Sequence, residues 1–558
     1  MAPLTLVIVG GNAAGMKAAS RARRLNPDCR IMVFEQKAYV SYGACGLPYF
    51  TSGVVKERQD LVVRSPQYFK SVGNIDVHTG HKVIRLNPSD RTITVKNLQT
   101  EKEQTVFFDN LILTTGVTPV IPPLPNINLH RIFTVKTLED GEAIRQCIRG
   151  EGCKEAVIVG AGLIGLEMAE NLHRAGLKVS VVELLPQVLP PFSPEIAFSV
   201  EKHLREKGVE VFPGERVKGF EGDEKQGVKR VVTEQRELKA DLVILSIGVR
   251  PNIELAKVAN ITLGPTGAIQ VNERMETSMS SIFAAGDCAE TKSLLTGKPV
   301  WVPLGSIANK QGRVAGENAA GGIATFRGVL PSIITKVFDL TIAKTGLNEQ
   351  EAIKAGFAVE RSIVLPFDKA HYYPGAKPLL LKMIADRMTR RILGGEILGE
   401  AGVDKRADAL AAAIYNDVTC EDLSQLDVAY SPPYSPAMDA LITGANVLLN
   451  KFSGIYTAIS ADELKQKIDR GGPFLLLDVR TAEEYQAGHI PGALHIPLDK
   501  LRERSLELKG KATGALVVYC GQSLRSYQAS RILKELGLGE AINLEGGIRM
   551  WRWEKEKA

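Results

Sequence analysis

The sequence has no run of eighteen apolar residues, no block of like charges and no CxxC pair of cysteines. The first absence predicts no membrane-spanning helix. The second, with a net charge of only +6 on 558 residues, gives no sign of nucleic-acid binding, although a small positive charge suits anionic small ligands. We therefore expect a protein that binds neither membranes nor nucleic acids.

Cysteine is scarce and widely spaced. The seven cysteines are Cys29, Cys45, Cys147, Cys153, Cys288, Cys420 and Cys520. Their odd number and spacing predict neither a disulfide framework nor a zinc site, and we assign no metal ligand. The N-terminus lacks a basic region before its short apolar run, so it does not resemble a signal peptide. We expect a cytoplasmic location, with cysteines other than 45 and 520 serving as packing residues.

A dinucleotide-binding fingerprint opens the chain. Residues 4–9 are predicted to form a buried parallel strand, 16–25 a helix and 30–34 a second strand. Small residues let the turn between them approach a pyrophosphate, and the acid after the second strand can accept from a ribose hydroxyl. The candidate cofactor contacts are Gly10, Asn12, Ala13, Ala14, Gly15 and Glu35. Asn12 replaces the usual second glycine, and a tight turn without a ligand is the alternative interpretation.

The fingerprint recurs between residues 156 and 183 with all three glycines present. Residues 166–175 are the predicted helix and 178–182 the following strand. The candidate contacts are Gly160, Gly162, Leu163, Ile164, Gly165 and Glu183. An acid at this strand end suits the free 2′-hydroxyl of NAD and repels the 2′-phosphate of NADP, so we favour NADH.

Three further segments complete the two units. Thr115 and Gly116 end the first unit and Gly248 ends the second, while a later strand leads into Gly286 and Asp287. With these segments the chain resembles the two-dinucleotide flavoprotein disulfide reductases. The resemblance implies FAD in the first unit and NAD(P)H in the second. It also implies that Gly286 and Asp287 hold the ribityl chain and phosphate of FAD.

The stretch SYGACGLPYF, residues 41–50, contains a single cysteine among small residues. Most of these reductases carry two cysteines spaced as CxxxxC. Here the positions five residues before and after Cys45 hold Val40 and Phe50, so Cys45 has no such partner. The stretch resembles the single-cysteine branch, which comprises coenzyme A-disulfide reductases, NADH oxidases and peroxidases, and NADH persulfide reductases. A lone buried cysteine is usually a packing residue. Beside two dinucleotide fingerprints, however, we interpret Cys45 as the redox cysteine.

Residues 331–445 resemble the dimerisation domain of the same family, which implies a homodimer. In the coenzyme A-disulfide branch, two tyrosines of this domain reach the cysteine and coenzyme A site of the partner subunit. The motifs HYYPG and VAYSPP assign these roles to Tyr372 and Tyr430. The alternative is that both tyrosines pack in an interface with bonded hydroxyls. We find no His-x-x-x-x-Glu pair of the glutathione-reductase kind near the end of this domain.

The last hundred residues resemble a rhodanese domain, on the motifs DVR, GHIPGA and GGIRMW. Cys520 ends a predicted strand before the helix 526–536, where backbone N–H groups and the helix dipole favour an anionic sulfur. Arg525 adds a positive charge at the end of this loop. We therefore interpret Cys520 as a sulfur carrier, with a purely structural domain as the alternative.

Coenzyme A is anionic, so its site should be basic. The resemblance places it along the first helix, near Lys17, Arg21 and Arg24, with Ser41 and Ala44 beside the thiol end. The spacing of the three cations places them on one helical face. A solvated basic face is an equally good interpretation of that spacing.

Together these patterns predict an α/β protein with two Rossmann-like domains, an α+β dimerisation domain and a C-terminal rhodanese domain. The expected boundaries are FAD-binding 1–118 and 253–327, NAD-binding 119–252, dimerisation 328–446, linker 447–455 and rhodanese 456–558. The predicted activity is NADH-dependent reduction of coenzyme A persulfide, polysulfide or coenzyme A disulfide. The alternatives are an NADH oxidase or peroxidase cycling through a cysteine sulfenate, and a redox or sulfur sensor.

Overall fold

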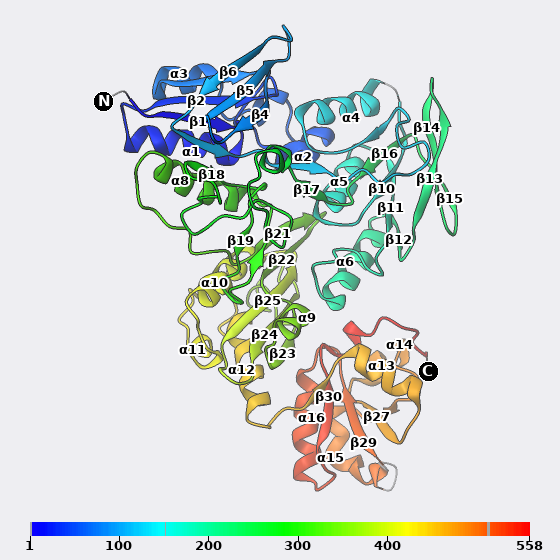
Figure 1. The fold of residues 1–558 in the computed structure, drawn as a ribbon. Coiled ribbons are helices and arrows are strands. Elements are labelled where there is room, and N and C mark those ends of the chain that lie inside the picture. Colours follow the sequence, from blue (N-terminus) through cyan, green and yellow to red (C-terminus); the bar gives the residue numbers. More distant parts are fainter. Residues whose placement is uncertain (1–2, 151, 510–513, 558) are drawn as a thin grey trace. The chain divides into compact units, whose positions relative to one another are not determined.

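The computed structural model describes residues 3–150, 152–509 and 514–557 (Figure 1). The chain forms two compact units: Met1–Pro190 with His203–Leu330, and Pro191–Lys202 with Pro331–Ala558. Among the described residues, no helix is long and apolar enough to cross a membrane.

The first parallel sheet of unit 1 has the strand order β18-β7-β1-β2-β3. Its strands are β1 (Thr5–Val9), β2 (Arg30–Glu35), β3 (Ile75–Thr79), β7 (Asn110–Leu113) and β18 (Ile282–Ala284). Val9 pairs with both Phe34 and Leu113, so the carboxyl ends of three strands meet at one edge. Ligands of open parallel sheets bind at this kind of edge.

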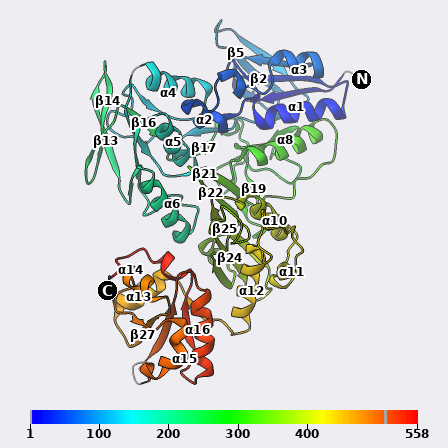
Figure 2. The ribbon, with the colours of Figure 1, turned by 180° about the vertical axis from the view of Figure 1, so that it is seen from behind.

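Helices α1 (Ala13–Leu25) and α8 (Gly305–Ala319) lie side by side against this sheet (Figures 1 and 2). A Cβ on Gly312 would lie 2.3 Å from the carbonyl oxygen of Ala14, so glycine permits the close approach. Helix α1 begins three residues earlier than expected, so the small residues after Asn12 form its first turn. The neighbouring short helices are η1 (Ala44–Gly46), α2 (Leu47–Ser52), η2 (Arg58–Leu61) and α3 (Pro66–Gly73).

The second parallel sheet of unit 1 has the order β12-β11-β10-β16-β9. Its strands are β9 (Ile132–Phe133), β10 (Glu155–Val159), β11 (Lys178–Glu183), β12 (Glu210–Pro213) and β16 (Leu242–Leu245). The accompanying helices are α4 (Leu138–Gly150) and α5 (Leu163–Arg174). Helix α6 (Pro194–Glu206) belongs to unit 2 up to Lys202 and to unit 1 from His203. Because α5 begins at Leu163 and not at Leu166, Leu163 and Ile164 form its first turn.

Small antiparallel sheets and one short helix complete unit 1. The strands are β4 (His81–Asn87), β5 (Thr92–Asn97), β6 (Glu103–Phe107), β8 (Val117–Pro119), β13 (Val217–Asp223), β14 (Gly227–Thr233), β15 (Glu237–Lys239), β17 (Val249–Pro251), β19 (Thr291–Lys292) and β20 (Pro299–Val300), and the helix is α7 (Glu254–Val258). The pair β8 and β17 joins the ends of the two dinucleotide-binding units.

Unit 2 contains an antiparallel sheet of order β21-β22-β25-β24-β23. Its strands are β21 (Ser332–Val337), β22 (Leu340–Gly346), β23 (Val359–Val364), β24 (Leu379–Asp386) and β25 (Ile392–Gly399). Its helices are α9 (Glu349–Ala355), α10 (Val403–Tyr415), α11 (Cys420–Ser424) and α12 (Ala440–Phe452). Residues 447–455, expected as a linker, are largely helical, because the apolar pattern of α12 continues to Phe452.

The last part of unit 2 is a parallel sheet of order β26-β30-β29-β27-β28. Its strands are β26 (Ala458–Ile459), β27 (Phe474–Asp478), β28 (Leu494–His495), β29 (Ala515–Tyr519) and β30 (Ala541–Leu544). The helices are α13 (Ala461–Arg470), α14 (Ala482–Ala487), η3 (Leu498–Lys500), α15 (Leu501–Arg504), η4 (Ser505–Leu508), α16 (Leu524–Glu535) and η5 (Gly547–Met550). Helix α16 begins two residues before the predicted start.

Candidate functional site

The turn between β1 and α1 requires glycine. Gly10 has a φ of +107°, and a Cβ on it would lie 2.2 Å from the carbonyl oxygen of Thr114. A Cβ on Gly15 would lie 1.9 Å from the carbonyl oxygen of Gly10. Any larger residue would push α1 away from the strand end, so the turn has the tight geometry of a pyrophosphate-binding loop. Thr115 and Gly116 follow β7 at the same edge of the sheet.

Glu35, at the end of β2, stabilises this turn. Glu35 accepts hydrogen bonds from the backbone N–H groups of Gly11 at 2.8 Å and Lys37 at 2.9 Å. A carboxylate oxygen has room for a second hydrogen bond, so Glu35 can still accept from a ribose hydroxyl. The bond to Gly11 was not anticipated by the sequence.

Asp287 is a half-buried residue whose carboxylate has one buried, unsatisfied oxygen. Its Oδ1 atom has no hydrogen-bond partner among the described residues, and burial raises the pKa of the carboxyl. The preceding residue, Gly286, donates its N–H to Gln311 Oε1 at 2.8 Å, which fixes the backbone. Leaving a buried acceptor unpaired is costly. A hydroxyl-bearing ligand such as the ribityl chain of FAD fits this position.

The second glycine turn repeats the first. Gly160 has a φ of +104°, and a Cβ on Gly165 would lie 2.0 Å from the carbonyl oxygen of Gly160. Glu183 accepts from the N–H groups of Ala161 at 2.7 Å and Leu185 at 2.8 Å. A Cβ on Gly162 would meet open space, so the backbone at that position is accessible to a ligand.

Cys45 lies in η1 and is exposed, whereas the other free cysteines are buried. The buried ones are Cys29, Cys288, Cys420 and Cys520. Cys45 is therefore not packed in a core of this chain, and its sulfur is accessible to another molecule. This is the property that a redox cysteine without a second cysteine needs.

Two hydrogen bonds connect the first glycine turn to the stretch that carries Cys45. Asn12 Oδ1 accepts from the N–H of Tyr42 at 3.1 Å, and the carbonyl of Gly11 accepts from the N–H of Ser41 at 2.9 Å. Ser41 has a φ of +51°, an uncommon conformation for a non-glycine residue. Asn12, the exception to the glycine fingerprint, therefore positions the cysteine stretch.

The charges around Cys45 include two residues that the sequence did not identify. Although Cys45 is accessible at the surface, the surrounding protein partly desolvates its thiol and raises the pKa above its ordinary value. The carboxylates of Glu167 and Asp287 raise the pKa of the thiol further. Lys136 opposes this effect and lowers the pKa of the thiol. Nothing in the local sequence singles out Glu167 or Lys136, because each reaches Cys45 only through the fold.

The three cations proposed to bind coenzyme A lie on α1, but not in equivalent surroundings. Arg21 pairs with Glu317 of α8 at 2.6 Å, so much of its charge is balanced within the protein. Arg24 is exposed and Lys17 is half-buried. The free charge of this face therefore lies mainly on Lys17 and Arg24, and the assignment of all three stays a prediction, as do Ser41 and Ala44.

The fold brings Tyr372 and Tyr430 together. Both are exposed, and a hydrogen bond to Tyr430 raises the pKa of Tyr372. Tyr430 also lines a cavity of about 490 Å³. The other lining residues are Lys405, Arg406, Ala409, Val428, Ala429, Ser431, Tyr434, Ser435, Asp439 and Leu441. The two phenols thus form a single exposed feature of the dimerisation domain, and their role at the site of a partner subunit stays a prediction.

In the rhodanese-like part, Cys520 follows β29 and begins the loop that leads into α16. Ser526 Oγ donates a hydrogen bond to Cys520 Sγ at 3.4 Å. Ser523 adopts a φ of +87° within the loop. A strained loop that curves around a cysteine before a helix of twelve residues is consistent with an anionic-sulfur site.

Arg525 is held by a neighbouring acid. Its guanidinium forms two hydrogen bonds with Glu484, at 2.7 and 2.8 Å, and these bonds lower the pKa of Glu484 to about 2. The positive charge expected at the loop's end is therefore largely compensated. A two-point ion pair orients the guanidinium beside Gly521, where a Cβ would lie 3.3 Å from it.

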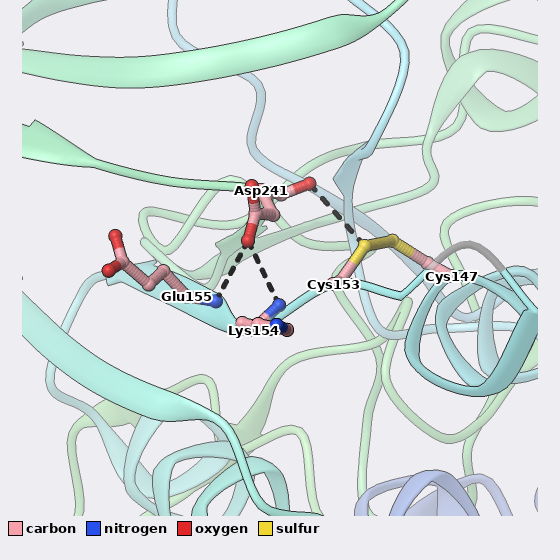
Figure 3. Close-up of a disulfide and its surroundings, with 5 residues drawn as sticks. All are labelled: Cys147, Cys153, Lys154, Glu155 and Asp241. Carbon is pink, nitrogen blue, oxygen red and sulfur yellow. Dashed lines mark hydrogen bonds between the residues drawn. A yellow bond between two sulfur atoms is a disulfide. The ribbon is translucent and has the colours of Figure 1, made fainter.

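The structure pairs Cys147 and Cys153 in a disulfide, which corrects the expectation that both are separate packing residues (Figure 3). Cys147 lies in α4 and Cys153 precedes β10, and their Cα atoms are 6.0 Å apart. Cys153 lies beside the carbonyl of Asp241, whose carboxylate accepts from the N–H groups of Lys154 and Glu155 at 2.9 and 3.1 Å. In the described ranges, no cluster of side chains could hold a metal ion.

Three family models match the chain. A pyridine nucleotide-disulphide oxidoreductase model matches residues 4–312, the dimerisation domain of the same family matches 332–442, and a rhodanese-like domain matches 460–554. These are the domains of a reductase fused to a rhodanese-like module. The chain belongs to the pyridine nucleotide-disulphide oxidoreductase family, whose cofactors are FAD and NAD(P)H.

The similar proteins include one curated relative and two solved structures. The chain is 40% identical over 445 residues to the NAD(P)H sulfur oxidoreductase (CoA-dependent) of Pyrococcus abyssi, covering 80% of this chain and 98% of the relative. A NAD-dependent persulfide reductase from A. fulgidus is 42% identical with a TM-score of 0.92, covering 98% of this chain and 100% of that chain. Reduced CoADR-RHD of Bacillus anthracis is 35% identical with a TM-score of 0.94, covering 99% and 98%.

Proposed function

We propose that this chain is an NADH-dependent reductase of coenzyme A persulfide, polysulfide or coenzyme A disulfide, with a rhodanese domain that carries sulfane sulfur. The observation that carries the proposal is Cys45, an exposed free cysteine beside the glycine turn and Asp287, in a chain that also holds Cys520 in a rhodanese loop. The names of its relatives support the same chemistry.

The two dinucleotide units supply the electrons in this proposal. When bound, FAD provides two electrons, taken from NADH, to reduce a sulfur–sulfur bond. The first glycine turn with Glu35, Gly286 and Asp287 would hold FAD, and the second turn with Glu183 would hold NADH. Glu183 favours NADH over NADPH because its carboxylate would repel a 2′-phosphate.

Cys45 performs the sulfur chemistry. Its thiolate attacks the sulfur of a persulfide that is bonded to coenzyme A, and hydrosulfide leaves with the electron pair of the broken bond. The resulting mixed disulfide between Cys45 and coenzyme A takes up two electrons and a proton, which releases the coenzyme A thiol and restores Cys45. One persulfide thus consumes one NADH and yields one hydrosulfide and one thiol. Lys136 assists because its charge favours the thiolate.

The coenzyme A moiety would lie along α1 at Lys17, Arg21 and Arg24, with its thiol end near Ser41 and Ala44. The dimerisation domain indicates a homodimer, in which Tyr372 and Tyr430 of one subunit would reach the cysteine site of the other. Cys520 would take sulfane sulfur from a donor and pass it on. This arrangement also fits a cytoplasmic enzyme that handles small thiols.

Product analysis tests the proposal. Purified holoenzyme with NADH and a small persulfide should release one hydrosulfide per NADH oxidised, under argon as well as in air. The competing assignment, an NADH oxidase or peroxidase, predicts rapid NADH consumption with oxygen or peroxide alone. A rate with oxygen equal to or above that with persulfide would overturn the proposal, and the fused rhodanese domain argues against that outcome.

A further inference from the structure

Glu545 is a fully buried carboxylate between two domains of unit 2. It follows β30 of the rhodanese sheet and has no solvent exposure. Lys451 Nζ lies 2.7 Å from one of its oxygens and Arg361 Nε lies 3.3 Å from the other. A buried charge without a counter-ion is strongly destabilising, so the burial of Glu545 depends on these cations of the dimerisation domain.

Arg361 of β23 connects three carboxylates from separate segments. It pairs with Glu349 of α9 at 2.6 Å, with Glu463 of α13 at 2.5 Å and with Glu545. Glu349 belongs to the dimerisation domain, whereas the other two acids belong to the rhodanese domain. The side chain of Arg361 is only 17% exposed, so water screens its ion pairs weakly. Arg361 is therefore the centre of the ionic contact between the two domains.

The residues directly after Glu545 form one wall of the Cys520 loop. The N–H of Gly546 donates to Ser523 Oγ at 2.7 Å, and the N–H of Ile548 donates to the carbonyl of Cys520 at 2.9 Å. A Cβ on Gly547 would lie 2.4 Å from that same carbonyl oxygen. A shift of this segment would thus release two hydrogen bonds of the loop and open the space around Cys520, which is now 1% exposed.

We propose that Glu545, fixed by Arg361 and Lys451, is a positioning residue that holds the Cys520 loop closed and in register for sulfur transfer. This inference rests on the sulfur-carrier role given to Cys520 under the proposed function. In that transfer the Cys520 thiolate attacks the outer sulfur of a sulfane donor, the donor's sulfur–sulfur bond breaks, and the donor leaves with the electron pair. No net reduction occurs, so the step requires loop geometry and no electrons from NADH.

The test compares Glu545→Gln and Arg361→Gln in the full-length holoenzyme with Arg502→Gln, which breaks an exposed ion pair to Glu535 on the same domain. Two readouts report on Cys520: thiosulfate-to-cyanide sulfur transfer, and the rate of Cys520 alkylation by iodoacetamide followed by mass spectrometry. We expect both anchor variants to lower kcat for sulfur transfer about tenfold and to raise the alkylation rate about tenfold, the effect of about 1.4 kcal/mol. Arg502→Gln should change neither by more than twofold.

Further measurements keep the outcomes distinct. Because the residues act through one contact, the double variant should be no worse than either single variant. NADH-linked reduction of a small persulfide at Cys45 should stay within twofold in every variant. If Glu545→Gln does not fold, Arg361→Lys serves as the anchor variant instead. Lysine retains the positive charge but lacks the planar guanidinium that pairs with several carboxylates, so the alkylation rate of Cys520 should be intermediate. Unchanged alkylation and transfer in the folded anchor variants would overturn the inference. Absence of sulfur transfer in the wild-type chain would instead refute the role of Cys520, while the alkylation contrast would still test the anchor.

Discussion

Asn12 Oδ1 accepts a hydrogen bond from the backbone N–H of Tyr42, three residues before Cys45. The asparagine that interrupts the first glycine fingerprint thereby joins the fingerprint to the cysteine stretch, beside the backbone bond from Ser41 to Gly11. Its position at the start of α1 leaves the turn itself intact, since Gly10 and Gly15 provide the required backbone conformations.

Replacing Asn12 by glycine should restore the usual fingerprint yet impair the enzyme. The variant loses one partly buried hydrogen bond, which is worth about 1 kcal/mol, so we expect an NADH-linked persulfide reduction rate about fivefold lower. Flavin content, read from the absorbance of the purified protein, should be unchanged. Asn87→Gly, at the end of β4, is the control: it also removes side-chain hydrogen bonds, to Asp90 and from Ser89, but outside the glycine turn. A variant with full activity would show that the bond to Tyr42 does not position Cys45.

The two sulfur sites should separate by substitution. Cys45→Ser should abolish NADH-linked persulfide reduction and leave sulfur transfer from thiosulfate, because the two cysteines stand on different domains. Cys520→Ser should have the converse effect with a small persulfide that enters directly. Both rates can be measured on the same preparations. Persistence of reduction in Cys45→Ser would contradict the central role of that residue, and loss of both activities in either variant would mean that the sites are obligately coupled.

Charges near Cys45 should tune its thiolate fraction in opposite directions. Since Lys136 lowers the pKa of Cys45 and Glu167 raises it, Lys136→Gln should slow alkylation of Cys45 at pH 8 and Glu167→Gln should accelerate it. We expect each rate to change by about threefold, because the alkylation rate follows the thiolate fraction when the thiol form dominates. Peptide mass spectrometry after timed exposure to iodoacetamide measures the rate. Lys298→Gln, at an exposed position, is the control, and equal rates in all variants would refute the electrostatic assignment.

The disulfide between Cys147 and Cys153 should stabilise the protein under oxidising conditions. Closing so short a loop lowers the entropy of the unfolded chain and raises the free energy of unfolding by about 2 kcal/mol. Urea unfolding should therefore shift to lower concentration when dithiothreitol is added. The double variant Cys147→Ser with Cys153→Ser should lack this response. Labelling of the unfolded, unreduced chain should modify the five free cysteines, and modification of all seven would show that the bond is absent.

The buried Glu396 should make stability depend on pH. Burial, partly opposed by Lys382, raises its pKa to about 7 in the folded protein. The folded state therefore binds more protons than the unfolded state between the ordinary carboxyl pKa and about 7. As a result, the contribution of Glu396 to the free energy of unfolding is fully retained at low pH and is lost as pH rises through this window. Glu396→Gln keeps an acceptor for Ser193 but has no charge to bury. We expect the variant to gain up to about 3 kcal/mol over wild type between pH 5 and pH 8, measured by urea unfolding. A pH-independent difference would contradict this assignment.

Several features were determined by the sequence alone, because they depend on local patterns. The glycine turns at Gly10 and Gly160, the acids Glu35 and Glu183, and the loop that begins at Cys520 all follow from spacing along one segment. Strand and helix types were correct there, while helix starts were displaced by two or three residues, since small turn residues can also be helical. The family assignment rested on these motifs and is confirmed by the matching models.

Only the tertiary structure decided the features that join distant segments. Lys136 and Glu167 influence Cys45, Tyr430 bonds to Tyr372, and Arg361 reaches Glu545 across 184 residues of chain. Such contacts depend on which strand edges and helix faces meet, and no residue pattern near either partner records that meeting. The disulfide was missed for a related reason: its two cysteines are close in sequence, but only the fold sets the distance and direction of their side chains.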